Sequence, residues 1–575
     1  MRALALLALS GCVSLAPNID IPPECVDSID CPMGESCRDG FCYGNPPQVS
    51  VSAQLLPPAT RPDLAATEIE SLTVSAEGSF EMSFAPSAEV SGRVVLPPLT
   101  SSVPARLRFS RASHIPGAPP LTVEVDATAG RGPGEVAFKV RLGLTSNDDL
   151  WLVTIVPDDT NVLPALNMTL AQAAPSRRVA IAVTGPTVID LPLVDAAGLK
   201  ELHGTVTDAA ARGLEGLRVS AYGRPAPGAP LELCSSSGRT LADGSYTLRL
   251  PVSWEDTFDV VVEPTATVRS PILRQREVPI PDGANPTVLD LSFPSFPTPA
   301  PYDLPVYSKA PAGGNAFAVD ADVVFTTTLL DEGPRTVTYR ATGTVDARGL
   351  ARVDLIPGTI DENRPYLVRV LPPLDEPHGS VWDVPVEVGA GSGGVLPDLI
   401  LPRRALMTGR VVDHEGDPVK DLAVRPGLSP SFILPLPPAL QVLLAGIRPV
   451  EVATNEDGRF EIYLDAELLG LPALYDLELV PPTGSLLPRW SVEAITIPTD
   501  LPAVDYGDLA LPRGALADGP VKDTLGNHVG TAEVRIWAPS DQALACAPIC
   551  VAPAHLRVLA ASDLSGRVRL VLPSP

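Results

Sequence analysis

Apolar and polar residues alternate along this chain in short runs, and turn residues interrupt the runs every eight to twelve positions. Arg218-Val219-Ser220 is such a run. Residues that alternate with a period of two place one face of a β-strand against a core. Long helices are not expected, because the 575 residues include 66 prolines and 45 glycines. The pattern therefore predicts a protein built almost entirely of β-strands.

One apolar strand recurs at a nearly constant spacing. Each copy opens on an aromatic residue and reaches a proline six positions later. The aromatic residues, 107, 108 and 109 positions apart, are Trp151, Phe258, Tyr366 and Tyr475. Glycines that precede a further expected strand keep a similar step at Gly244, Gly349, Gly458 and Gly566. An Asp-Leu pair recurs with a similar step, beginning at Asp190, Asp290, Asp398 and Asp508. A fixed period of this length indicates one domain written repeatedly.

Each repeat has the length of a β-sandwich, and its glycine suits a hairpin turn that requires a positive φ. We therefore predict an all-β, linear array of about five sandwiches. The expected boundaries are 49–190 for repeat 1 with an N-terminal extension, 191–290 for repeat 2, 291–399 for a degenerate repeat 3, 400–508 for repeat 4 and 509–575 for an incomplete repeat 5. Segments 1–12 and 13–48 precede the array as a signal peptide and a Cys-rich region.

Two motifs within the repeats carry a family resemblance. G-x-V-x-D-x-x-G-x-x-V spans 409–419, and T-x-x-x-G-x-aromatic-x-hydrophobic-x-L spans 454–464. This pair resembles the carboxypeptidase regulatory-like domain, a transthyretin-like, Ig-like sandwich of seven strands. Weaker copies lie at 204–208 with 240–250, at 519–529 with 562–572, and near 92 and 308. The resemblance implies the fold but no activity, because such modules serve as stalks, accessory domains and carbohydrate-binding-like folds.

The head of the chain resembles the signal of a bacterial lipoprotein. Met1-Arg2 precedes a seven-residue apolar run, and Leu9-Ser10-Gly11-Cys12 resembles a lipobox whose cysteine is acylated. The alternative is an ordinary short secretory signal. The favoured interpretation is lipidation of Cys12 and attachment to the membrane through acyl chains. Since Val13 follows the cysteine, we expect an outer-membrane lipoprotein, surface-exposed or periplasmic.

Cysteine use agrees with an oxidising compartment. Four cysteines are grouped in a short stretch with little apolar material, Cys25, Cys31, Cys37 and Cys42. A disulfide knot is the favoured interpretation and zinc the alternative; three pairings are possible. The stretch resembles the small Cys-rich knots of myxobacterial-type lipoproteins. Cys546 and Cys550 are expected to form a local disulfide, and Cys234 to be a buried thiol.

Catalytic chemistry is not indicated. The six histidines are scattered, and none is followed by glutamate three positions on, so no metal or catalytic site is predicted. Asp413 and Asp523 are read as turn residues that bond their own backbone, with calcium between modules as the alternative. We expect no cofactor.

Charge limits the partners. The net charge of −26 disfavours nucleic acid and a polybasic contact with a membrane. Phe432 opens an uncharged segment, 432–447, inserted in the fourth repeat. This segment either folds back to cap the sandwich, which we favour, or lies exposed as a contact surface.

These observations predict a non-catalytic, surface-displayed lipoprotein that acts as a structural stalk or as a binding or adhesion scaffold for a cell-surface protein or polysaccharide. The alternative is an array of carbohydrate-binding modules. That alternative predicts exposed aromatic side chains on one face, for which Trp254, Trp382 and Trp537 are the candidates.

The last repeat is expected to lack a strand. After Gly566 the next aromatic strand should begin near residue 583, yet the sequence ends at Pro575. Either the sequence is truncated, or the final sandwich has an open edge that a partner strand completes.

Overall fold

The computed structural model describes residues 50–573 and the backbone of 35–38 and 41–44, with some segments left out. Within 50–573 these segments are 76–77, 97–98, 100–101, 130–134, 146–148, 161, 164–167, 195–197, 227–228, 253, 266–270, 282–285, 311–313, 359–363, 392, 438–439, 442–443, 445–446, 448–449, 500 and 540–553.

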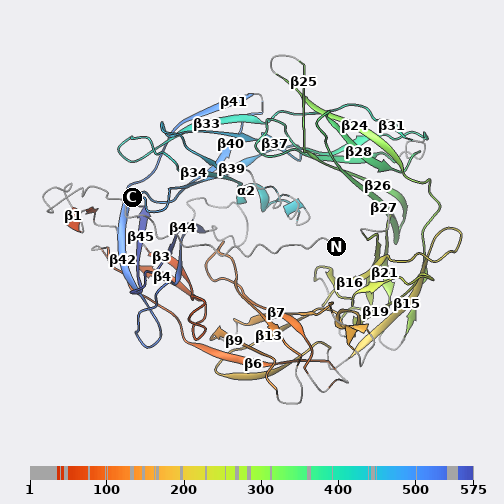
Figure 1. The fold of residues 1–575 in the computed structure, drawn as a ribbon, viewed down its shortest axis with the longest axis horizontal. Helices are drawn as coiled ribbons and strands as arrows, with labels where there is room; N and C mark the ends of the chain where they lie inside the picture. The colour runs from red at the N-terminus through yellow and green to blue at the C-terminus, as the bar shows by residue number, and fades with distance from the viewer. Residues whose placement is uncertain are drawn as a thin grey trace.

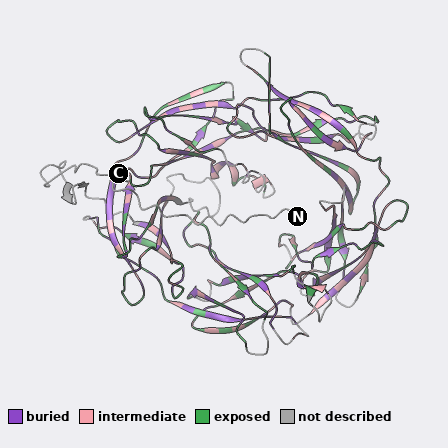
Figure 2. Ribbon diagram, viewed as in Figure 1, coloured by how far each residue is buried: buried purple, intermediate pink, exposed green. Residues whose placement is uncertain are grey.

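The described residues form five β-sandwiches arranged in a ring (Figure 1). Each sandwich has its own hydrophobic core. Buried and exposed residues alternate along many strands (Figure 2), as expected where only one face of a strand packs against a core. The predicted all-β fold of repeated sandwiches is confirmed.

The first sandwich pairs a four-stranded sheet, β13-β10-β7-β8, with a three-stranded sheet, β14-β6-β9. Its strands are β6 (Ser87–Val95), β7 (Ala105–Arg111), β8 (Leu121–Ala127), β9 (Phe138–Gly143), β10 (Trp151–Pro157), β13 (Arg177–Ile181) and β14 (Thr187–Pro192). Shorter elements of this sandwich are β11 (Val162–Leu163), β12 (Met168–Thr169) and α1 (Leu170–Ala173).

The second and third sandwiches share one sheet, because β21 pairs with β27. The second contains β15 (Leu199–Thr207), β16 (Arg218–Gly223), β17 (Glu232–Leu233), β18 (Gly238–Arg239), β19 (Ser245–Pro251), β20 (Thr257–Glu263), β21 (Ile272–Pro279), β22 (Thr287–Val288) and β23 (Leu291–Ser292). The third contains β24 (Ala300–Lys309), β25 (Asn315–Phe317), β26 (Asp322–Glu332), β27 (Arg335–Thr344), β28 (Leu350–Leu355), β29 (Tyr366–Leu371), β30 (Val381–Val386), β31 (Gly394–Val395) and β32 (Leu399–Leu401).

The fourth sandwich repeats the arrangement of the first, with sheets β35-β34-β39-β40 and β36-β33-β41. Its elements are β33 (Ala405–Val412), β34 (Ala423–Leu428), α2 (Pro430–Ile433), β35 (Val452–Ala453), β36 (Arg459–Leu464), β37 (Glu467–Leu468), β38 (Leu471–Pro472), β39 (Leu474–Val480), β40 (Trp490–Thr496) and β41 (Ala503–Ala510). Phe432 and Leu444 of the inserted segment are buried in its core, which supports the predicted cap.

The recurring aromatic strand lies in the core of each of the first four sandwiches. Trp151, Phe258, Tyr366 and Tyr475 are each no more than 1% exposed. The Tyr366 hydroxyl donates to the carbonyl of Ile356, and the Tyr475 hydroxyl donates to the carbonyl of Asp465. A buried tyrosine needs such a partner for its polar end, so these bonds explain why tyrosine is tolerated there.

The four hairpin glycines adopt the expected positive φ, between 73° and 81°.

A fifth sandwich joins the two ends of the described chain. Its C-terminal half consists of β42 (Gly514–Lys522), β43 (Glu533–Pro539), β44 (Ala554–Ala561) and β45 (Arg567–Pro573). Its N-terminal half consists of β3 (Ser50–Leu56), β4 (Thr67–Thr73) and β5 (Met82–Ser83). The sheets run β4-β3-β43-β44 and β45-β42-β5, so β3 pairs with β43 and β5 pairs with β42. The remaining strands, β1 (Glu35–Arg38) and β2 (Phe41–Gly44), form a separate hairpin.

The expected open edge is therefore wrong. The missing strand is β3, which lies 477 residues before its partner in the pair Leu56 and Glu533. Residues 50–84, which sequence analysis placed in the first repeat, belong to the fifth sandwich. The predicted linear array is consequently a closed ring, because pairing between its two ends leaves neither end free.

Residues 50–84 match the second half of the other repeats strand by strand. The acidic residue of each Asp-Leu pair precedes the parallel edge strand or lies within it, and Leu191 of the first copy stands opposite Val94. In the fifth sandwich Met82 stands opposite Val521, so Glu81-Met82 replaces Asp-Leu. Val51 and Pro57 likewise keep the six-residue spacing of the recurring strand, with valine in place of the aromatic residue.

In the first, second and fifth sandwiches a glycine makes room for this edge strand: Gly92, Gly204 and Gly519. A Cβ on Gly204 would lie 1.8 Å from the carbonyl oxygen of Leu289, the residue before Asp290. A Cβ on Gly519 would lie 2.2 Å from the carbonyl oxygen of Phe80, the residue before Glu81. No real side chain tolerates such distances, so in these sandwiches glycine is a packing requirement of the parallel edge strand. In the fourth sandwich a Cβ on Gly409 would instead meet the Phe460 ring at 2.8 Å.

Candidate functional site

The contacts that close the ring form the most distinctive site in the described residues. We call the contacts between residues 50–84 and 514–573 the closing interface. Beyond the strand pairs, it contains backbone hydrogen bonds from Asp518 to Gly78 and from Phe84 to Lys522, at 2.8 and 2.9 Å. Lys522 also forms an ion pair with Glu81 at 2.8 Å.

Asp523 connects a turn of the C-terminal half to the N-terminal half. Its carboxylate accepts hydrogen bonds from the backbone of Leu525 and Asn527, both at 2.9 Å, and pairs with Arg61 at 3.1 Å. Burial alone would raise the pKa of Asp523, but the hydrogen bonds from Asn527, Arg61 and Leu525 outweigh burial and lower the pKa to about 2. The prediction that this aspartate bonds its own turn is confirmed. Asp413 does the same with Glu415 and Asp417.

Acid is expected to weaken the closing interface. The pKa of Asp523 is lower in the folded protein than its ordinary value of 3.8. The stabilisation is therefore fully present above pH 3.8 and is lost as the pH falls toward 2. The measurement is the urea midpoint of unfolding between pH 2 and 5, for the wild type and for Asp523→Asn. The variant should have the lower midpoint at pH 5 and the smaller loss on acidification.

Asp126→Asn is the matched control, because the Asp126 side chain is 81% exposed on β8. This control should follow the wild-type curve. Equal acid sensitivity of the wild type and Asp523→Asn would contradict the assignment.

The junction between the fifth and first sandwiches is organised around Glu68 on β4. Its side chain is 3% exposed and accepts hydrogen bonds from the Ser113 hydroxyl at 2.5 Å, the His114 amide at 3.1 Å and the Gln54 amide at 3.0 Å. Burial alone would raise the pKa of Glu68, but these bonds overcome that effect and lower it. A buried carboxylate satisfied from both sandwiches holds the two in a defined orientation.

The junction between the third and fourth sandwiches contains a buried ion pair. Arg404 and Asp465, with side chains 1% and 6% exposed, lie 3.3 Å apart. Asp465 also accepts a hydrogen bond from the backbone of Ser380 at 3.0 Å, and Arg404 donates to the carbonyl of Pro373 at 2.6 Å. The pair therefore links the loop before β30 to the start of β33.

Three of the five tryptophans, all described, lie at junctions. Trp382 of the third sandwich packs against the core of the fourth. The Arg557 guanidinium of the fifth sandwich lies 4.7 Å from the ring centre of Trp490 in the fourth. Trp254 of the second lines a cleft that faces the first. Trp151 and Trp537 are buried. None of the five tryptophans is exposed, so the exposed tryptophans that the carbohydrate-binding alternative requires are not found.

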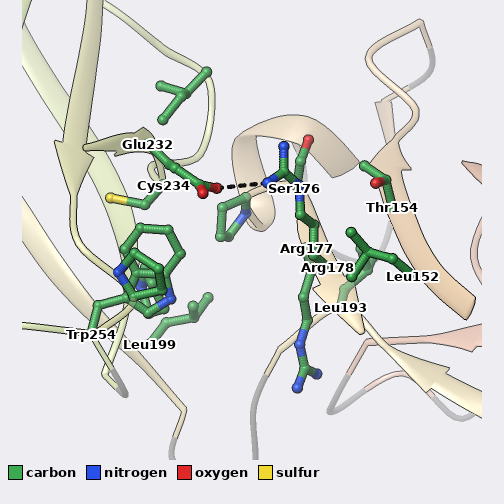
Figure 3. Close-up of a pocket in the computed structure, with 14 residues that line it drawn as sticks. Leu152, Thr154, Ser176, Arg177, Arg178, Leu193, Leu199, Glu232, Cys234 and Trp254 are labelled. Atoms are coloured by element: carbon green, nitrogen blue, oxygen red, sulfur yellow. Dashed lines mark hydrogen bonds and ion pairs between the residues drawn. The ribbon is translucent and has the colours of Figure 1, made fainter. Parts of the chain in front are cut away.

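A cleft of about 730 Å³ separates the first and second sandwiches (Figure 3). Arg178 from the first sandwich forms an ion pair across it with Glu232 of the second, at 3.0 Å. Cys234 also lines the cleft, but burial raises the pKa of this thiol to about 12. A protonated, buried thiol is not a nucleophile, and no histidine is among the described residues that line this cleft.

The remaining predicted site residues receive little information. Cys12, Cys25, Cys31, Cys546 and Cys550 lie outside the described residues. For Cys37 and Cys42 the structure describes only the backbone, which places them opposite each other in the β1–β2 hairpin. In the described part of the chain no cluster of three or more metal-ligand side chains occurs. No helix among the described residues is long and apolar enough to span a membrane.

No protein-family model matches the sequence, and no curated protein matches it. Among solved structures, the Bacillus anthracis TIE protein is 12% identical, with 74% of each chain covered and a TM-score of 0.16. A streptococcal ancillary pilin is 11% identical, covering 56% of this chain and 99% of the pilin, with a TM-score of 0.19. The major pilin SpaD from Corynebacterium diphtheriae is 12% identical, covering 55% and 98%, with a TM-score of 0.14. Such TM-scores carry no information about function.

Proposed function

We propose that this protein is a non-catalytic display scaffold, held at the cell surface by an acyl anchor on Cys12. The observation that carries the proposal is the closure of five sandwiches into a ring by pairing of β3 with β43. Linked sandwiches normally move relative to one another unless their interfaces are extensive. A closed ring restrains all the junctions at once, so it presents its loops in fixed relative positions.

The chemistry of the described junctions supports the same proposal. Buried charged groups in clefts often mark catalytic sites, but structural ion pairs perturb such groups as well. Here Glu68, Asp465 and Arg404 each form hydrogen bonds to a neighbouring sandwich. These bonds fix the position of that sandwich. The proposal retains a carboxypeptidase regulatory-like origin for the repeats, a disulfide knot before them, and a surface protein or polysaccharide as partner.

Cys12→Ser is expected to release the protein from the membrane fraction. An acyl chain is a membrane attachment that requires the cysteine thiol, and serine cannot replace it in lipoprotein processing. The measurement is fractionation of cells followed by detection of the protein. Cys234→Ala is the matched control. Because Cys234 is buried in the second sandwich, this substitution should leave fractionation unchanged. Continued membrane fractionation of Cys12→Ser would rule out the acyl anchor.

The scaffold itself is tested by shape and by binding. Small-angle scattering of the chain without its first twelve residues should match a closed ring and not an extended rod. Binding of the same protein to a glycan array tests whether the partner is a polysaccharide. Specific binding to a glycan would restore the carbohydrate-binding alternative.

A further inference from the structure

We propose that the fifth sandwich is an exchange site through which copies of this chain link to one another, each copy supplying residues 50–84 to the C-terminal half of the next. The partner is thus a second copy of the same chain. This inference goes beyond the scaffold function and does not depend on the acyl anchor.

The first support is the way the core of the fifth sandwich is divided. Its described buried residues fall into two equal sets of nine. One set comes from the N-terminal half: Val51, Ala53, Leu55, Leu64, Leu72, Val74, Phe80, Met82 and Phe84. The other comes from the C-terminal half: Ala517, Val521, Val529, Ala532, Val534, Ile536, Val568, Leu570 and Leu572. Neither half can bury its apolar face alone, so each requires the complementary half.

The second support is the connection between the halves. In the fourth sandwich, β36 ends at Leu464 and β39 begins at Leu474, so its halves are joined by a short segment. In the fifth, the halves are joined only through residues 85–513, which form the other four sandwiches. Separating the two halves therefore breaks both of its sheets without unfolding another sandwich. Domain swapping needs an element of this kind, which leaves as a unit.

The third support is the specificity of the open face. A strand that replaces β3 must place small and branched apolar residues at alternate positions, as Ala53 and Leu55 do opposite Ile536 and Val534. The same segment must also supply a short parallel strand beside β42, with an apolar residue opposite Val521. In this chain Met82 of β5 is that residue. A second copy of the chain carries this combination of strands, so it fits the open half without adjustment.

Protein concentration decides between closure and exchange. When two binding partners are joined by a short flexible linker, the effective concentration of one for the other is on the order of millimolar. This effective concentration falls when the connection does not hold the two partners close together. Here the connection is four sandwiches, so every change in a junction angle lowers the effective concentration. Because the donor and acceptor faces differ, exchange makes closed dimers or longer head-to-tail chains.

A cysteine pair tests the proposal on the otherwise intact chain. Leu56 and Glu533 are directly opposite partners at the end of the β3–β43 ladder. Opposite residues of antiparallel strands have Cα atoms about 4.5–5.5 Å apart, a range that suits a disulfide. Leu56→Cys/Glu533→Cys is incubated in mild denaturant over a hundredfold range of concentration, returned to buffer, oxidised and run on a non-reducing gel. We expect cross-linked monomer at the lowest concentration and covalent dimers and longer chains at the highest, several-fold more abundant than in the control.

The matched control is Arg425→Cys/Glu478→Cys, whose positions are partners on β34 and β39 of the fourth sandwich. Both strands lie in one continuous domain, so this pair should remain intramolecular at every concentration. If the two pairs give equal amounts of dimer, or if the first gives none, the proposal is wrong. Light scattering of the wild type after the same treatment provides a readout without substitutions. A mass that stays monomeric at every concentration would also overturn the proposal.

Discussion

Leu55→Ala is expected to open the ring. Leu55 is fully buried on β3, pairs with Val534 across the closing interface and packs in the shared core. A buried Leu→Ala change costs about 2–5 kcal/mol, a large fraction of the roughly 5–15 kcal/mol that stabilises a typical domain. Because the two halves are joined along the chain only through the other four sandwiches, this loss favours their separation while those four sandwiches remain folded.

The expected readouts are a longer scattering envelope and a new urea transition at low denaturant. Proteolysis should also become faster in the segment between β3 and β4. Leu559→Ala is the matched control, because Leu559 lies on β44 of the same sandwich but is 57% exposed. If Leu55→Ala and Leu559→Ala behave alike, the closing interface does not hold the ring together.

Asp465→Ala is expected to uncouple the third and fourth sandwiches. Removing this carboxylate leaves the Arg404 guanidinium buried without its charged partner, and breaking a buried pair in this way costs about 3–5 kcal/mol. The Ser380 amide also loses its acceptor. Since Asp465 and Arg404 of the fourth sandwich are bonded to Ser380 and Pro373 of the third, the loss should appear as a lower unfolding temperature for both neighbours.

Two further variants separate this effect from a general change of charge. Glu456→Ala removes a carboxylate that is 84% exposed and pairs with Lys420, so it should cost no more than about 1 kcal/mol. Arg404→Met/Asp465→Leu removes both charges and should recover much of the stability, because no unpaired charge remains. An Asp465→Ala protein with wild-type stability would show that the pair does not couple the sandwiches.

Much of the fold could be predicted because its determinants are local. The aromatic residue, the proline six positions later and the hairpin glycine each act within one strand or one turn, and the structure places them as expected. The burial of Cys234 and the turn role of Asp523 followed from equally local reasoning. The inserted segment at Phe432 was predicted to fold back because an uncharged segment seeks a core.

The closing strand was missed because its marks are weakened. Val51 stands where the other copies have an aromatic residue, and Glu81-Met82 stands where they have Asp-Leu. Both replacements preserve the physical role. Valine fills the core position, Glu81 pairs with Lys522 as Asp190 pairs with Arg93, and Met82 is fully buried. A search by role, with the proline spacing retained, would have found a half-repeat at the start of the chain.

By itself, the sequence determined the strands, their turns and the repeat, because alternation and turn chemistry depend on neighbouring residues. Only the tertiary structure decided that the array closes and that three of the five tryptophans lie at junctions between sandwiches. Those outcomes depend on which strand edges and side chains meet across hundreds of residues. An open edge and a half-repeat look like two separate defects along the chain, and they complete each other only when four folded sandwiches bring them together.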